Sequence, residues 1–195
     1  MIRVAVVDDH PALRAGLRTV LDLEPGIVFA GESDGSEEHV WPMLKVVHPD
    51  LLLLDYHLPR GDGLQLCYRV KQSVPAPKVI VFTAYASPKL VLPATLAHAD
   101  GILPKGAGAR ELFGAIRSVY GGETLLPAVP PGVLEEAASD LLGDDRAVVG
   151  MLLDGASEAE VAQTLQLPPR DVRHTVQRIL SALRLDVPAA RSSLD

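Results

Sequence analysis

Short, wholly apolar runs alternate with amphipathic segments over the first 120 residues, and this alternation limits the possible folds more than any other feature. The runs are VAVV at 4–7, IVFA at 27–30, LLLL at 51–54, VIVF at 79–82 and a weaker GIL at 101–103. Continuous apolar runs of this length are typical of strands that are buried on both faces. The segments between the runs are long enough for helices. The pattern therefore predicts an α/β fold with a parallel sheet covered by helices on both faces.

The pattern changes after residue 120. Residues 121–138 contain three prolines and three glycines, which predict a linker that ends at the start of a helix. From residue 139 onward the pattern is helical, with a capping-box sequence at 157–160 and a Pro-Pro break before the amphipathic segment 170–184. We therefore expect an α/β domain over residues 1–120, a linker over 121–138 and a small all-α domain over 139–195.

Polar side chains follow the apolar runs at the points where the strands should end. Asp8 and Asp9 follow the first run, Asp55 follows LLLL, Thr83 follows VIVF and Lys105 comes shortly after GIL. The carboxyl ends of parallel strands meet at one edge of a sheet, so these side chains should lie close together. Three clustered carboxylates repel one another, and Mg²⁺, which prefers oxygen ligands, would relieve that repulsion. The sequence therefore predicts a magnesium site at this edge.

The stretches VVDDHP, LLLLDYHLPRGDG, VFTA and ILPKGA resemble, in this order, the motifs of bacterial two-component response regulator receivers. The resemblance extends from residue 2 to about residue 120. It implies a flavodoxin-like fold with a five-stranded parallel sheet, and phosphoryl transfer from a sensor histidine kinase onto Asp55. It also implies that Thr83 and Lys105 contact the phosphoryl group. The Mg²⁺ ligands implied by the resemblance are Asp9, Asp8 (largely through water), Asp55 and the backbone carbonyl of His57.

One position departs from this family pattern. Many receivers have an aromatic residue three positions before the lysine, and it turns inward as the threonine moves. That position is Ile102 here, and isoleucine cannot make the same exchange with a hydroxyl tip. Three alternatives follow: Tyr85 takes over this role, the helical segment 86–99 takes it over, or activation is communicated differently. Pro93 should make that helical segment short, kinked or shifted.

The segment VAQTLQLPPRDVRHTVQRIL has the apolar spacing of a helix-turn-helix. Together with a helix expected near 144–154, it is similar to the LuxR-type output domain of NarL-like regulators. Segment 170–184 contains four arginines and one aspartate, and its basic side lies opposite its apolar side, as in helices that enter the major groove. A solvated face on an amphipathic helix is the alternative. The residues expected to contact promoter DNA are Arg170, Arg173, His174, Gln177 and Arg178.

Charge and sequence detail leave two other functions open. The formal net charge is −7, and residues 121–195 carry 6 Lys/Arg against 12 Asp/Glu, which argues against non-specific binding to polyanions. Asp171 and the stretch LLGDDRAVVG also depart from the LuxR-type pattern, so a degenerate helix-turn-helix could serve dimerisation or protein interaction. A haloacid-dehalogenase-like phosphatase would use Asp55 as nucleophile, but it would need a second acid where this chain has His57.

The remaining features indicate a cytoplasmic protein. Cys67 is the single cysteine, so an intrachain disulfide is impossible and a reducing compartment is expected. The N-terminus does not resemble a secretory signal, and no apolar run approaches the roughly 20 residues that a membrane helix needs. We expect a phosphoacceptor switch rather than a catalyst. Phosphorylation should promote a homodimer that controls transcription.

Overall fold

A computed structural model describes residues 1–59, 61–141 and 143–185 of the chain. Its α/β part contains strands and helices that alternate along the sequence. These are β1 (Ile2–Val7), α1 (Pro11–Leu23), β2 (Ile27–Ser33), α2 (Glu37–Val47), β3 (Leu51–Leu54), α3 (Gly63–Lys71), β6 (Lys78–Thr83), α4 (Pro88–Leu96), β7 (Gly101–Pro104) and α5 (Ala109–Tyr120). A short antiparallel hairpin of β4 (His57–Leu58) and β5 (Gly61–Asp62) lies between β3 and α3.

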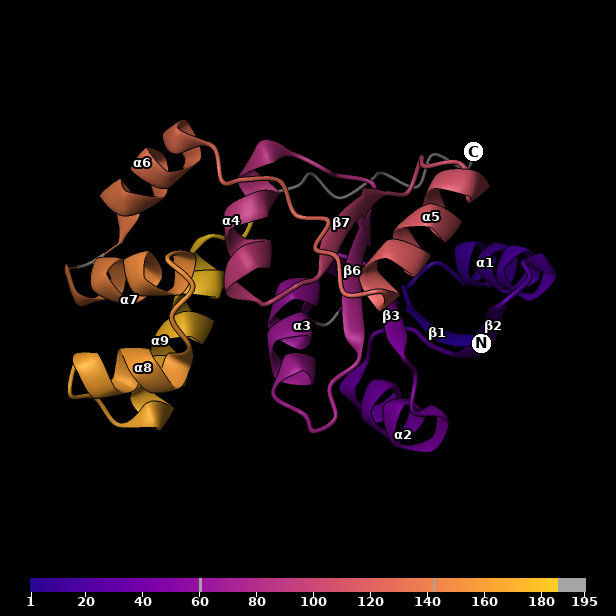
Figure 1. Cartoon of the computed structure of the whole chain (residues 1–195), viewed down its shortest axis with the longest axis horizontal. Coiled ribbons are helices and arrows are strands. Elements are labelled where there is room, and N and C mark those ends of the chain that lie inside the picture. Colours follow the sequence, from indigo (N-terminus) through magenta and orange to yellow (C-terminus); the bar gives the residue numbers. More distant parts are fainter. Residues whose placement is uncertain (60, 142, 186–195) are drawn as a thin grey trace.

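The five long strands form one parallel sheet in the order β2-β1-β3-β6-β7, with helices on both faces (Figure 1). The leucines of β3 show why its run is wholly apolar. Leu51 and Leu53 pack in the cluster that contains α1 and α5, whereas Leu52 and Leu54 pack in the cluster that contains α2, α3 and α4. The flavodoxin-like, five-stranded parallel fold expected from the sequence is confirmed.

Within the described residues, four helices follow the α/β part: α6 (Pro131–Asp140), α7 (Gly143–Leu153), α8 (Glu158–Thr164) and α9 (Pro169–Ala182). The capping box at the start of α8 is formed, since Ser157 and Glu160 bond each other's backbone N–H groups. Most of α6 lies inside the expected linker, and residues 186–195 of the expected C-terminal domain lie outside the described residues. The proposed division into two domains and a linker stays a prediction. Among the described helices, none is long and apolar enough to cross a membrane.

Helix α4 lies between the sheet and the C-terminal helices (Figure 1). It is nine residues long with Pro93 inside it, so it is short, as the proline predicted. Residues from Leu90 to Leu96 are buried except for the half-buried Thr95, so every face of the helix is covered. A helix that is apolar on all sides needs a partner on all sides. The C-terminal helices supply that partner, and their buried side chains belong to the same apolar cluster as α3 and α4.

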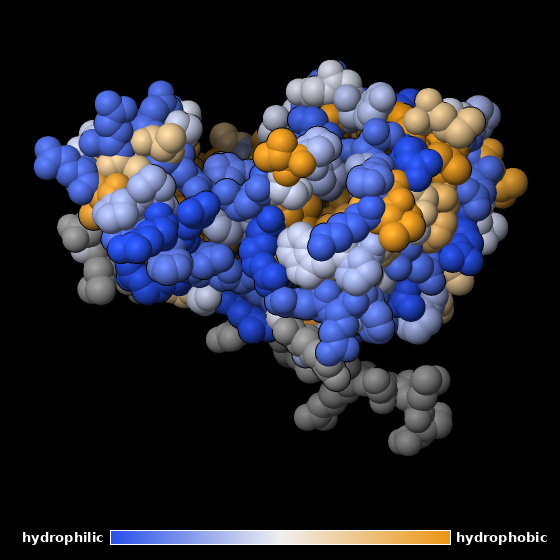
Figure 2. All heavy atoms as spheres, turned by 90° about the horizontal axis from the view of Figure 1, so that it is seen from below, coloured by the Kyte–Doolittle hydropathy of each residue, from blue (hydrophilic) through white to orange (hydrophobic). Residues whose placement is uncertain are grey.

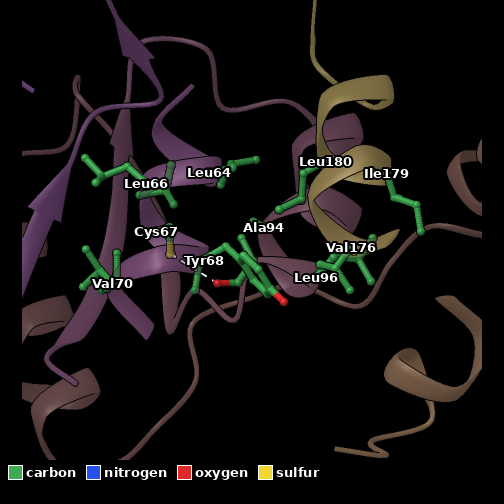
Figure 3. Close-up of a cluster of buried hydrophobic side chains, with 14 of the residues drawn as sticks. Leu64, Leu66, Cys67, Tyr68, Val70, Ala94, Leu96, Val176, Ile179 and Leu180 are labelled. Atoms are coloured by element: carbon green, nitrogen blue, oxygen red, sulfur yellow. Dashed lines mark hydrogen bonds between the residues drawn. The ribbon is translucent and has the colours of Figure 1, made fainter. Parts of the chain in front are cut away.

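Figure 3 shows this shared cluster at close range. Leu64 and Tyr68 of α3 lie on one side, Val176 and Leu180 of α9 lie on the other, and Leu96 of α4 is drawn beside Val176. All five side chains are almost completely buried. Because burial of such side chains is the main favourable contribution to association, the C-terminal helices are held against the α/β part by apolar packing.

Candidate functional site

The polar residues expected at the carboxyl edge of the sheet do lie together there. Asp8 follows β1, Asp55 follows β3 and Thr83 ends β6, and these three residues are 1%, 3% and 0% exposed. Buried carboxylates are costly unless they are paired. Their charge therefore needs a compensating partner.

Lys105 compensates both buried carboxylates. Its Nζ lies 2.7 Å from an Oδ2 of Asp8 and 2.7 Å from an Oδ2 of Asp55. Burial raises the pKa of the Asp55 carboxyl, although the hydrogen bond from Lys105 opposes the rise. Burial acts against the charged form of Lys105, but its hydrogen bonds to the two acids outweigh burial and raise the pKa of the ammonium. One ammonium thus holds two acids at the end of β1 and β3.

Asp9 and His10 complete the acidic cluster. His10 Nδ1 lies 2.6 Å from Asp9 Oδ1 and 3.1 Å from Asp8 Oδ1. Ligand atoms of Asp8, Asp9, His10 and Asp55 all lie within 4.8 Å of one another. Despite the nearby imidazole, Asp9 Oδ1 is buried without a hydrogen bond of good geometry. A set of carboxylate oxygens with one unsatisfied buried oxygen fits a hard divalent cation such as Mg²⁺. His10 also occupies the N-cap position of α1.

Gly63 lets α3 begin directly against the backbone of Asp55. A Cβ atom at Gly63 would lie 2.0 Å from the Asp55 carbonyl oxygen and 2.9 Å from Tyr56 Cα. Gly63 N donates to Tyr56 O at 2.9 Å, and Asp62 caps the helix by accepting from Leu64 N at 2.8 Å. Gly63 was not among the site residues predicted from the sequence. An Asp-Gly pair at a helix start was the available signal, but it is common in ordinary loops.

The loop after β6 connects the site to its surroundings. Thr83 Oγ1 accepts a hydrogen bond from Tyr85 N at 3.1 Å, and Lys105 N donates to Thr83 O at 2.8 Å. Ile102 is half-buried in β7 and packs against the apolar cluster of α3 and α4. The roles assigned to Thr83, Lys105 and the Mg²⁺ ligands, including the carbonyl of His57, remain predictions.

The residues expected to contact DNA are not equally accessible on α9. Arg170, Arg173, His174 and Arg178 are exposed, and Gln177 is half-buried. The carbonyl of Gln177 accepts from Gln65 Nε2 of α3 at 2.6 Å, so this part of α9 lies against the α/β part. Arg178 is engaged within the C-terminal helices, where its two terminal nitrogens lie 2.6 and 2.7 Å from the carboxylate oxygens of Asp145.

Polar contacts surround the apolar seam between α3 and the C-terminal helices. Tyr68 Oη donates to Glu158 Oε1 at 2.7 Å, and the ring of Tyr68 stacks on His98. Burial acts to raise the pKa of Glu158, but hydrogen bonds from His98 and Tyr68 prevail and lower it. Gln65 Nε2 also donates to Ser181 Oγ at 3.0 Å. Glu158 thus stays charged, and its contacts hold α8 to α3.

The surface of the C-terminal helices is largely hydrophilic on the face seen in Figure 2, where these helices form the lobe on the left. The α/β part shows a more mixed surface in the same view. The apolar side chains of α9 are among those turned towards the shared cluster. This distribution matches a module that packs by one side and leaves its charged side in solvent.

Comparison with known proteins identifies relatives over most of the chain. The family described as the response regulator receiver domain matches residues 4–117. The DNA-binding transcriptional activator DevR/DosR of Mycobacterium tuberculosis is 29% identical over 95% of this chain and 90% of its own. The response regulator UvrY of Escherichia coli is 30% identical over 95% of this chain and 89% of its own.

A solved structure supports the same relationship. A two-component response regulator of the LuxR family from Aurantimonas sp. SI85-9A1 superposes with a TM-score of 0.60 at 26% identity. The match covers 71% of this chain and 96% of the other. These matches favour a transcription regulator over an interaction module, and a phosphoacceptor switch over a phosphatase.

Proposed function

Because this chain belongs to the response regulator family, we propose that it is a cytoplasmic switch whose Asp55 accepts a phosphoryl group from a sensor histidine kinase and thereby controls DNA binding. The observation that carries the proposal is the buried Asp55 carboxylate, held 2.7 Å from Lys105 Nζ in the acidic cluster of Asp8 and Asp9. This arrangement pairs a buried nucleophile with a cation in a site that is nearly closed to solvent.

The residues of the site support phosphoryl transfer in distinct ways. A carboxylate oxygen of Asp55 attacks the phosphorus as the bond from phosphorus to the kinase histidine breaks. Lys105 neutralises charge on the phosphoryl oxygens, and the Thr83 hydroxyl donates a hydrogen bond to one of them. Asp8, Asp9, Asp55 and the carbonyl of His57 would hold Mg²⁺, which supplies further positive charge to the phosphoryl group when bound. Catalysis here is positioning and electrostatic stabilisation.

Phosphorylation changes the charge balance at the edge of the sheet. The phosphoryl group carries about −1.5 to −2 charges, and Asp55 loses its own carboxylate charge, so the site beside Asp8 and Asp9 becomes more negative by about 0.5 to 1 charge. Lys105 and the Thr83 hydroxyl are then drawn towards the new phosphoryl oxygens, and the loop that follows Thr83 moves with them. The change thus reaches the β6–α4 loop, which leads directly into the helix against which the C-terminal helices pack.

The C-terminal helices provide the output through DNA binding as a homodimer. Helices α8 and α9 occupy the positions of a helix-turn-helix, and the exposed Arg170, Arg173 and His174 lie on α9, as a recognition helix requires. The relative DevR/DosR is described as a DNA-binding transcriptional activator. In the described conformation Gln65 bonds the Gln177 and Ser181 side of α9, so DNA binding requires this contact to open.

We expect the double variant Arg170→Ala/Arg173→Ala to bind promoter DNA more weakly when phosphorylated. If both arginines contact phosphates, the slope of log affinity against log salt should fall by about 1 for each residue removed. Fluorescence anisotropy over a salt series, on a sequence selected with the wild-type protein, measures both quantities. Arg110→Ala is the control, because this exposed arginine lies on α5, outside the C-terminal helices. Equal affinity and equal slope in the double variant and wild type would contradict the DNA interface.

A further inference from the structure

Tyr56 connects the phosphoacceptor to the C-terminal helices. Its side chain is 2% exposed, and its hydroxyl oxygen accepts a hydrogen bond from Leu185 N at 2.7 Å. Leu185 lies just beyond the end of α9. Tyr56 is also the chain neighbour of Asp55, so a backbone shift at the phosphoacceptor is passed directly to the residue that holds the end of α9.

A row of contacts joins Tyr56 to Thr83. The rings of Tyr56 and His57 meet edge to face with centroids 5.3 Å apart, and the rings of His57 and Tyr85 have centroids 5.7 Å apart. Tyr85 N donates to Thr83 Oγ1 at 3.1 Å. Displacement of the Thr83 hydroxyl therefore acts on Tyr85 through a hydrogen bond, and on His57 and Tyr56 through ring contacts.

This row of contacts offers a route for the signal in a chain that lacks the aromatic residue used by many receivers. Ile102 has no polar tip that could exchange places with Thr83. The movement of Thr83 needs another receiving group, and Tyr85 is bonded to the same hydroxyl that should turn towards the phosphoryl oxygens. The row begins at Thr83, beside the phosphoacceptor, and ends at the C-terminal helices, so it connects the site of phosphorylation to these helices.

We propose that Tyr56 is the residue that reports phosphorylation of Asp55 to α9. In the unphosphorylated protein, Tyr56 holds Leu185, and α9 stays against Gln65. When the Thr83 hydroxyl turns towards the phosphoryl group, Tyr85 loses its anchor, the rings of His57 and Tyr56 shift, and the bond to Leu185 breaks. The proposal rests on the proposed function of Asp55 and deepens it by naming the route of the signal.

The chain offers a matched control for Tyr56. Tyr68 makes a similar bond between the two parts, since its hydroxyl donates to Glu158 at 2.7 Å. Tyr68 lies on α3 and belongs to neither the loop of Asp55 nor the row of rings. Tyr56→Phe and Tyr68→Phe each remove one hydroxyl that bonds the C-terminal helices, but only Tyr56→Phe should break the link to phosphorylation.

Hydrogen–deuterium exchange in peptides covering α9 and Leu185 provides the test. The full chain is treated with or without acetyl phosphate and Mg²⁺, and phosphoryl uptake is measured by intact mass. In wild type we expect slow exchange that rises on phosphorylation. In Tyr56→Phe we expect exchange already raised roughly 2- to 10-fold before phosphorylation, with little further rise. In Tyr68→Phe we expect a similar initial rise and the full further rise on phosphorylation.

Tyr85→Leu tests the opposite end of the row. It should keep the slow exchange of the unphosphorylated wild type and lose most of the rise on phosphorylation. All three variants should take up phosphoryl groups, so the response is compared at equal modification. The proposal is overturned if phosphorylated Tyr56→Phe shows the same rise as Tyr68→Phe, or if phosphorylation leaves exchange in wild-type α9 unchanged. Absence of phosphoryl uptake by wild type would instead refute the proposed function, and the relay with it.

Discussion

Replacing Lys105 by alanine is expected to lower the free energy of unfolding of the Mg²⁺-free protein by about 3 kcal/mol and to stop phosphoryl transfer to Asp55. The ammonium lies 2.7 Å from both Asp8 and Asp55, and its removal leaves two buried carboxylates without compensation. Breaking a buried ion pair costs about 3–5 kcal/mol, and the lower end applies because the Lys105 side chain remains 15% exposed. Urea denaturation in the presence of a chelator measures the loss.

Two comparisons separate this electrostatic effect from a simple loss of packing. The double variant Lys105→Ala/Asp8→Asn removes one of the repelling charges, so it should recover part of the stability without recovering phosphoryl uptake. Mg²⁺ should stabilise Lys105→Ala more than it stabilises wild type, because the cation takes over the compensation of Asp8 and Asp55. Unchanged urea midpoints in Lys105→Ala, with or without Mg²⁺, would contradict the electrostatic role of Lys105.

Gly63→Ala is expected to destabilise the protein by about 3 kcal/mol and to reduce phosphoryl uptake. The added Cβ would lie 2.0 Å from the Asp55 carbonyl oxygen, and this contact is between backbone and a rigidly attached atom. Overpacking costs about 1–3 kcal/mol where side chains can yield, so we expect the upper end here. To relieve this clash, α3 and the loop of Asp55 must move apart, and this movement displaces the phosphoacceptor from Lys105.

Gly61→Ala is the matched control, because Gly61 lies two residues earlier, in β5, and a Cβ there meets nothing within 4 Å. It should unfold at the wild-type urea concentration and accept phosphoryl groups at the wild-type rate. A Gly63→Ala variant that behaves like Gly61→Ala in both measurements would show that α3 can shift without disturbing Asp55.

The sheet and the acidic cluster could be predicted because both depend on short sequence patterns, namely the apolar runs and the residues that directly follow them. The LLLL run predicted a strand buried on both faces, and its leucines do alternate between the two apolar clusters. Since parallel strands end at a common edge, the residues after each run could be placed together. The end of β2 was harder to predict. It continues through the polar residues Glu32 and Ser33, which an edge strand tolerates because only one side of it is paired.

The contacts between the α/β part and the C-terminal helices could not be predicted. Tyr56 and Leu185 are 129 residues apart, and Tyr68 and Glu158 are 90 residues apart, so nothing in the local sequence connects them. Arg178 was expected to contact DNA, but its pairing with buried Asp145 depends on how α7 packs on α9. One sequence feature did indicate that a further part of the chain covers α4. The segment of α4 is apolar on every side, which indicates a helix covered from both directions.

Intact mass analysis after incubation with acetyl phosphate and Mg²⁺ is the decisive test of whether Asp55 becomes phosphorylated. We predict that the full chain gains one phosphoryl group, that peptide mapping places it on Asp55, and that Asp55→Asn gains none. A folded wild-type protein that stays unmodified by acetyl phosphate and by histidine kinase donors, or an Asp55→Asn variant modified to the same extent as wild type, would contradict the account.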